Sequence, residues 1–174
     1  MAKPAFHVLF LCTGNSARSI LAEAILARAG HGRFRAFSAG SQPKPTPHPL
    51  ALQILQDMGF DTQFARSKSW QEFAAPNAPK MDLVLTVCDS AAAEACPVWP
   101  GAPMTAHWGL PDPAAVDGPM VRRRQAFIDA FQVLRARIAF LVDLPVEDLD
   151  RRSLQEQLTA IGAVGLPPQK TLAQ

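Results

Sequence analysis

The feature that most constrains the fold is the loop at residues 12–19, which reads Cys-Thr-Gly-Asn-Ser-Ala-Arg-Ser. It directly follows an apolar run at 6–11 that is typical of a buried strand, and a helical pattern begins where it ends. Small residues let the backbone curl so that several N–H groups point inward, next to the positive end of the helix. The sequence therefore predicts a strand, a tight loop and a helix that together form a cradle for a tetrahedral oxyanion.

Cys12 and Arg18 bracket this loop and give it a chemical function. The guanidinium of Arg18 presents a planar fork of donors that matches phosphate-like oxygens. In the positive field of the loop, we expect the pKa of Cys12 to fall well below its free value of about 8.5, which would make a nucleophilic thiolate the resting form. The alternative, a buried thiol and an unrelated surface arginine, leaves their spacing at a strand-to-helix junction unexplained. The predicted oxyanion-binding residues are Thr13, Gly14, Asn15, Ser16, Ala17, Arg18 and Ser19.

Composition limits the class of protein. With 174 residues, 48% of them hydrophobic and 18% charged, the chain has enough core for one domain spanning 1–174. A net charge of +2 is too small to indicate nucleic-acid binding. We expect no membrane association and a cytoplasmic location, because no apolar stretch approaches about 18 residues and the start lacks the apolar core of a signal peptide. In a reducing cytosol, the three cysteines are expected to be reactive thiols.

Short apolar runs alternate with helical patterns, which indicates parallel βαβ units. Strands are expected at 6–11, 34–38, 81–87 and 103–108, and helices at 19–29, 49–58, from Pro119 onward and at 147–161. We predict an α/β fold in which a four-stranded parallel sheet of order 2-1-3-4 is flanked by helices. Residues 5–142 would form the core, and 143–174 a C-terminal helical extension that ends in a loose tail.

Two further cysteines follow the third strand. Because strands 1 and 3 are neighbours about 4.8 Å apart, Cys12 and Cys88 would face each other within reach of a disulfide. Cys96 is separated from Cys88 by an alanine-rich stretch that predicts a short helix, which would keep these two sulfurs apart unless it unwinds. Inert packing of both thiols stays open as an alternative. A zinc site is disfavoured because the spacing does not match a zinc knuckle.

Asp112 follows the fourth strand at the same edge of the sheet. A carboxylic acid there could protonate a leaving oxygen. The alternative is a turn or cap residue, because aspartate before proline commonly has that role.

Several motifs, taken in order, resemble the arsenate reductases built on the low-molecular-weight tyrosine phosphatase fold, over about residues 5–142. They are the loop at 12–19 with the following Leu-Ala-Glu, the Thr-Val-Cys that ends at Cys88, the Cys-Pro-Val-Trp-Pro-Gly that begins at Cys96, and the His-Trp-Gly that leads to Asp112-Pro. The resemblance implies a relay of thiols. Cys12 would attack arsenate held by Arg18 and the loop amides, while Asp112 protonates the departing oxygen. Cys88 would then attack Cys12 and release arsenite, and Cys96 would move the disulfide outward by attacking Cys88.

The resemblance also implies partners. Phosphate and sulfate would compete with arsenate, and an external thiol system would reduce the final disulfide. Thioredoxin, glutaredoxin with glutathione, and other small thiols all stay open, because the spacing from Cys88 to Cys96 does not select one. No tightly bound cofactor is expected. Members of this kind bind potassium beside the loop, and Asn15, Glu23 and Ser38 are similar to parts of that site.

Two other classes of function remain. A low-molecular-weight phosphatase would need only Cys12, Arg18 and Asp112, but the chain contains no tyrosine, so the aromatic pair that follows the acid in many such phosphatases is missing. A non-enzymatic phosphocysteine carrier or thiol-based oxyanion or metalloid sensor is the other class. A sensor would bind arsenite tightly and show no turnover.

Overall fold

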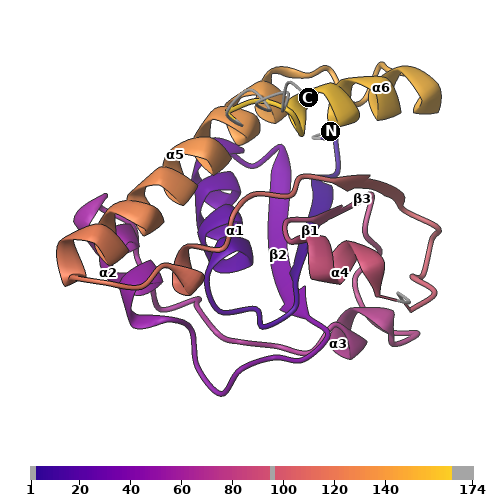
Figure 1. Cartoon of the computed structure of the whole chain (residues 1–174). Helices are drawn as coiled ribbons and strands as arrows, with labels where there is room; N and C mark the ends of the chain where they lie inside the picture. The colour runs from indigo at the N-terminus through magenta and orange to yellow at the C-terminus, as the bar shows by residue number, and fades with distance from the viewer. Residues whose placement is uncertain (1–2, 95–96, 166–174) are drawn as a thin grey trace, which may run out of the picture.

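The structure, a computed structural model, describes residues 3–94 and 97–165 of the chain (Figure 1). Its centre is a four-stranded sheet in the order β2-β1-β3-β4, in which every neighbouring pair is parallel. The strands are β1 (Phe6–Cys12), β2 (Phe34–Gly40), β3 (Leu83–Thr86) and β4 (Met104–His107). This confirms the predicted fold class and strand order.

The pleat of β1 separates two layers of core. Val8 and Phe10 pack into the larger cluster on one face of the sheet, and Leu9 and Leu11 pack into a smaller cluster on the other. Since both faces are covered, the strand is apolar throughout and does not alternate with polar residues.

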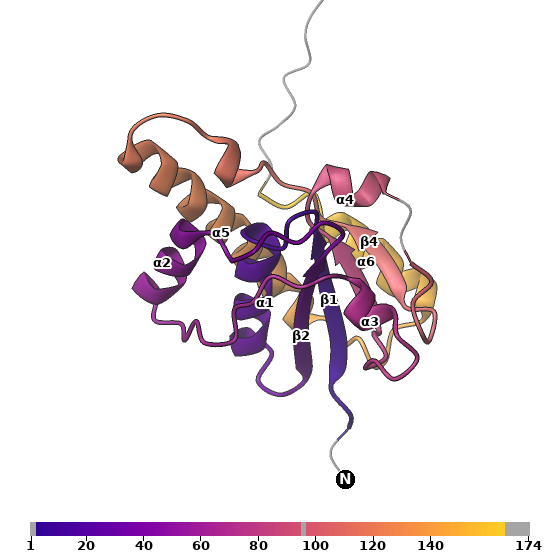
Figure 2. The ribbon, with the colours of Figure 1, turned by 90° about the horizontal axis from the view of Figure 1, so that it is seen from below.

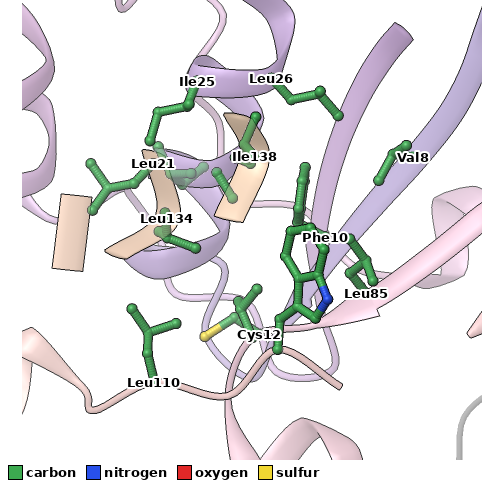
Figure 3. Packing of buried hydrophobic residues seen from close by; sticks show 14 of the residues in the cluster. Val8, Phe10, Cys12, Leu21, Ile25, Leu26, Leu85, Leu110, Leu134 and Ile138 are labelled. Carbon is green, nitrogen blue, oxygen red and sulfur yellow. The ribbon is translucent and has the colours of Figure 1, made fainter. Parts of the chain in front are cut away.

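Helices cover the larger cluster, as Figures 1 and 2 show. They are α1 (Arg18–Ala29), α2 (Pro49–Asp57), α5 (Met120–Asp143) and α6 (Arg151–Ile161). Residues on the inner faces of α1 and α5, among them Leu21 and Leu134, meet the sheet residue Phe10, and Cys12 lies at the margin of the same cluster (Figure 3). The opposite face carries the short helix α3 (Gln71–Ala74) together with Trp70 and Trp99.

The predicted elements are confirmed, with four differences. Strands β3 and β4 are shorter than predicted, at 83–86 instead of 81–87 and at 104–107 instead of 103–108. Strand β2 runs on to Gly40. The last helix begins at Arg151 instead of 147, because the carboxylate of Asp150 accepts the Ser153 N–H at 2.8 Å and caps the helix there. The helix α3 and the 3-10 turn η1 (Pro113–Ala115) were not predicted, because they are too short to show a periodic sequence pattern. The predicted tail lies outside the described residues, among which no helix combines the length and apolarity that crossing a bilayer requires.

Arg137 joins the C-terminal extension to the loop that follows β4. Its side chain is fully buried in α5, and it donates to the carbonyl oxygens of Trp108 at 2.6 Å, Gly109 at 3.2 Å and Val164 at 3.0 Å. Trp108 in turn donates its indole N–H to the Leu158 carbonyl in α6 at 2.9 Å. The extension therefore helps to position the segment that leads to Asp112.

An Arg137→Met variant is expected to lose about 3 kcal/mol of unfolding free energy, because one buried and two partly buried carbonyl groups would lose their donors. The melting temperature should fall by about 10 °C. Urea unfolding measures the loss, and Arg135→Met, an exposed change on the same helix, is the control. Equal stability of both variants would show that solvent replaces the Arg137 contacts.

Candidate active site

The loop at 12–19 is held by its outward-facing carbonyl groups. The carbonyl oxygens of Thr13, Gly14 and Ser16 accept the backbone N–H groups of Gln42 at 2.9 Å, Lys44 at 2.9 Å and His48 at 2.8 Å. At the centre of the loop, Asn15 adopts a left-handed conformation with φ of 43°. With the carbonyls turned outward, the N–H groups of residues 15–18 have no acceptor within the described part of the chain. Free donors on a tight turn at a helix start are the arrangement that binds tetrahedral anions.

Gly40, at the end of β2, allows this strand to pass close to the loop at 12–19. A β-carbon at this position would lie 2.4 Å from the Thr13 carbonyl oxygen and 2.9 Å from the Asn15 nitrogen. Any side chain here would push the loop away from the strand, so the close approach requires glycine.

Arg18 is the first residue of α1 and lies almost buried beside the loop. One guanidinium nitrogen donates to the Leu110 carbonyl at 2.9 Å, and another lies 3.7 Å from the carboxylate of Asp112. Its Nε is buried and has no hydrogen-bond partner among the described residues. An oxyanion in the loop would supply the acceptor that this donor lacks.

The loop forms the floor of a cavity of about 310 Å³. Its lining residues are Cys12, Thr13, Gly14, Ser16, Ala17, Arg18, Gln42, Lys44, Cys88, Ser90, Asp112 and Ala114. The cavity thus unites the predicted nucleophile, the arginine, the second thiol and the acid. Sequence reasoning missed Gln42 and Lys44, in the loop after β2, and Ser90, in the helix after Cys88, because none of the three carries a periodic or motif signal.

Cys88 lies at the start of α4 (Asp89–Ala93), the predicted short helix, and its sulfur faces Cys12. Two backbone donors approach this sulfur, the Thr13 N–H at 3.3 Å and the Ala91 N–H at 3.4 Å. The Thr13 hydroxyl lies 3.6 Å from the sulfur and donates to the Glu94 carboxylate at 3.3 Å. The hydrogen bond from Cys12 and these further donors lower the pKa of Cys88 to about 5.

The expected resting thiolate at Cys12 is corrected by this geometry. The hydrogen bond to Cys88 and burial raise the pKa of Cys12, and the nearby charge of Arg18 offsets them only in part. Near neutral pH, Cys12 and Cys88 therefore share one negative charge between their two sulfur atoms. The charge of Arg18 lowers the pKa of Cys12 in the predicted direction, but sequence reasoning did not consider the opposing effects of Cys88 and of burial.

The thiol pair should lose its first proton at a pH of about 5, the value to which Cys88 is lowered. Ultraviolet absorption by one thiolate should therefore appear between about pH 4 and pH 6, far below the free thiol value of about 8.5. Titration of the folded protein measures this change. Cys88→Ala should abolish the step in this range, and a wild-type step near the free thiol value would contradict the assigned charge.

Asp112 is a cap residue and also lies where the predicted acid would act. Its carboxylate accepts the Ala114 N–H at 3.0 Å and caps the turn η1, yet it also lines the cavity and faces Arg18. Cys96, the third predicted relay residue, lies outside the described residues.

The residues compared with a potassium site do come together. Glu23 and Ser38 lie with the loop residue Asn15 around the side chain of Lys68. Sequence reasoning missed Lys68, because an isolated lysine between two strands matches no motif.

A cysteine and an arginine on an anion-binding loop, faced by a second thiol and a carboxylate, define a class of cysteine-dependent enzymes that act on tetrahedral oxyanions. The chain belongs to the low molecular weight phosphotyrosine protein phosphatase family, whose model matches residues 7–153.

Relatives within this family are arsenate reductases. One from Shouchella clausii is 32% identical over 131 residues, which cover 75% of this chain and 91% of the relative. One from Brevibacillus brevis is 34% identical over 116 residues, or 67% of this chain and 83% of the relative. A solved thioredoxin-dependent arsenate reductase of Corynebacterium glutamicum has a TM-score of 0.57 and 27% identity; the match covers 78% of this chain and 61% of that one. The tyrosine phosphatase Wzb of Escherichia coli K30, with a TM-score of 0.63 and 21% identity over 79% of this chain and 96% of Wzb, shows the fold alone.

Proposed function

We propose that this protein is an arsenate reductase that transfers two electrons from a pair of its own cysteines to arsenate. The observation that carries the proposal is the second thiol: Cys88 lines the same oxyanion cavity as Cys12, close enough for the two thiols to affect each other's pKa. Hydrolysis of a phosphate ester needs a nucleophile and an acid, but it has no use for a second sulfur in contact with the first. Reduction requires one.

In the first step, arsenate binds on the free amides and Arg18, and Cys12 reacts as a thiolate whose proton has gone to solvent. The sulfur of Cys12 forms a bond to arsenic while an As–O bond breaks, and the departing oxygen leaves as water with a proton from Asp112. Arsenic is still in its oxidised form at this stage, bound to the sulfur of Cys12.

In the second step, Cys88 loses its proton to solvent and attacks the sulfur of Cys12. A disulfide forms as the S–As bond breaks, and the electron pair of that bond stays on arsenic. Arsenite takes up protons from solvent and leaves. Two thiols have been oxidised and one arsenate reduced.

In the third step, Cys96 would attack Cys88 and carry the disulfide to the surface, where an external dithiol reduces it. The helix α4 between these residues has five residues, a length at which helices are marginally stable. Thioredoxin is the favoured reductant because the relative from Corynebacterium glutamicum depends on it. The reaction would detoxify arsenate in the cytoplasm.

Single-turnover release of arsenite from the fully reduced protein, with no external reductant, tests this function. We expect one arsenite per chain and, by peptide mapping, a disulfide between Cys88 and Cys96. Hydrolysis of p-nitrophenyl phosphate with no arsenite and all thiols intact would show a phosphatase instead. Tight binding of arsenite without turnover would show a sensor.

A further inference from the structure

A lysine already occupies the cluster of oxygen atoms beside the loop. The ammonium of Lys68 lies 2.8 Å from the Arg66 carbonyl oxygen, 3.2 Å from the Ser38 hydroxyl, 3.5 Å from the side-chain oxygen of Asn15 and 3.8 Å from the carboxylate of Glu23. Its side chain is only 7% exposed. A buried lysine with four oxygens around its nitrogen is held there by the structure, since lysine is rarely buried without such partners.

These oxygens do not fit a potassium ion while Lys68 keeps this position. The ion would need Asn15, Glu23 and Ser38 as ligands, and each already lies against the ammonium. Two positive charges a few ångströms apart inside the protein would also repel each other strongly.

We propose that Lys68 is a built-in cation, which takes the place of a monovalent metal ion and holds the oxyanion loop in its binding conformation. Lys68 is a positioning residue, because it acts on the loop through Asn15 and not on the oxyanion.

The hydrogen bonds of Asn15 connect Lys68 to the loop. The Lys68 backbone N–H donates to the side-chain oxygen of Asn15 at 2.8 Å, which the ammonium also approaches. The side-chain nitrogen of Asn15 donates to the Ser19 hydroxyl at 2.9 Å. The Ser67 hydroxyl donates to the backbone carbonyl oxygen of Asn15 at 2.7 Å. Asn15 has the positive φ at the centre of the loop, a conformation that persists only where the surroundings hold it.

Charge balance gives Lys68 a second effect on the loop. Glu23 is almost buried and accepts the Ser38 hydroxyl at 2.5 Å. Burial raises the pKa of Glu23 and lowers the pKa of Lys68, and each charge partly offsets the shift of the other. Without Lys68, an uncompensated carboxylate would lie beneath a loop that has to bind an anion, and binding would weaken.

The proposal can be tested with Lys68→Ala, which opens space for a small cation among the same oxygens. Melting temperature and the affinity for inorganic phosphate are measured in potassium chloride and in choline chloride at equal ionic strength. Thallium NMR then reports directly whether a potassium-sized cation binds. None of these measurements depends on arsenate reduction, so the result stands whether or not the proposed function does.

The wild type should show the same melting temperature and phosphate affinity in both salts and no bound thallium. In choline chloride, Lys68→Ala should melt at a lower temperature and bind phosphate about ten- to a hundredfold more weakly, the loss typical of removing a group that orients a binding residue. Potassium should restore both properties, and thallium should bind. Lys80→Ala, which removes an exposed lysine, should behave like the wild type.

Two results would overturn the proposal. One is a saturable increase in wild-type stability or phosphate affinity with potassium, which would show that an ion binds there despite Lys68. The other is a Lys68→Ala protein with unchanged phosphate affinity in choline chloride. If Lys68→Ala does not fold in either salt, the double variant Glu23→Gln/Lys68→Met removes both charges together. It should fold and bind phosphate more weakly in either salt, and wild-type phosphate affinity in this variant would contradict the role of Lys68.

Discussion

A Cys12→Ser variant is expected to lose arsenate reduction completely, by about 10⁴-fold or more, because removing a covalent nucleophile has effects of this size. The serine hydroxyl would neither attack arsenic at neutral pH nor form a disulfide with Cys88. Binding should survive, since the free amides of residues 15–18 and the guanidinium of Arg18 do not involve the sulfur. Single-turnover arsenite release measures the loss, and calorimetric titration with phosphate measures the retained affinity.

The Cys12→Ser measurement separates a chemical effect from a structural one. If phosphate affinity fell together with activity, the loop would have collapsed, and Cys12→Ala would be needed to identify the cause. Arsenite formation at more than about 1% of the wild-type rate would mean that another sulfur starts the reaction, since loss of a true nucleophile leaves less.

The fold could be predicted because its determinants are local in the sequence. Apolar runs such as 6–11 and helical stripes such as the one after Pro119 repeat with the periods of strands and helices, and parallel connection rules then restrict the strand order. Elements without a period were missed: α3 has four residues, and η1 has three. The boundary of α6 was misplaced because its start is set by side-chain hydrogen bonds between Asp150 and Ser153, which hydrophobic periodicity does not reveal.

The residues of the candidate site that follow from the loop itself or from the strand order were predicted. The residues contributed by irregular segments were missed. Cys12 and Arg18 belong to one loop, and Cys88 follows a neighbouring strand, so the topology alone brings them together. Lys44 and Lys68 come from irregular segments whose paths no periodicity fixes. The direction of the shift in the pKa of Cys12 was mispredicted for a different reason: the nearby Cys88 and burial raise this pKa and outweigh the charge of Arg18.

A Cys88→Ser variant is expected to form no arsenite, a loss at least as complete as that of Cys12→Ser, yet to keep the chemistry that Cys12 performs alone. The hydrogen bond to Cys88 is the largest cause that raises the pKa of Cys12, so without the Cys88 thiolate this pKa should fall and Cys12 should become a stronger nucleophile near neutral pH. Exchange of labelled oxygen between water and inorganic phosphate reports attack by Cys12 without any need for electrons. This exchange should persist at the wild-type rate or above it.

The two variants together locate the step at which reduction and hydrolysis diverge. Both chemistries begin with an oxyanion bonded to the sulfur of Cys12, and they differ in what attacks next: water attacks the central atom in a phosphatase, whereas the sulfur of Cys88 attacks the sulfur of Cys12 in a reductase. Loss of arsenite with retained exchange in Cys88→Ser, repeated in Cys88→Ala as the matched control, would assign Cys88 to electron transfer alone. Loss of exchange in both variants would mean that Cys88 is needed for the first attack, as the base that accepts the proton of Cys12. Arsenite release by either variant would exclude Cys88 from the relay and leave its low pKa without a catalytic use.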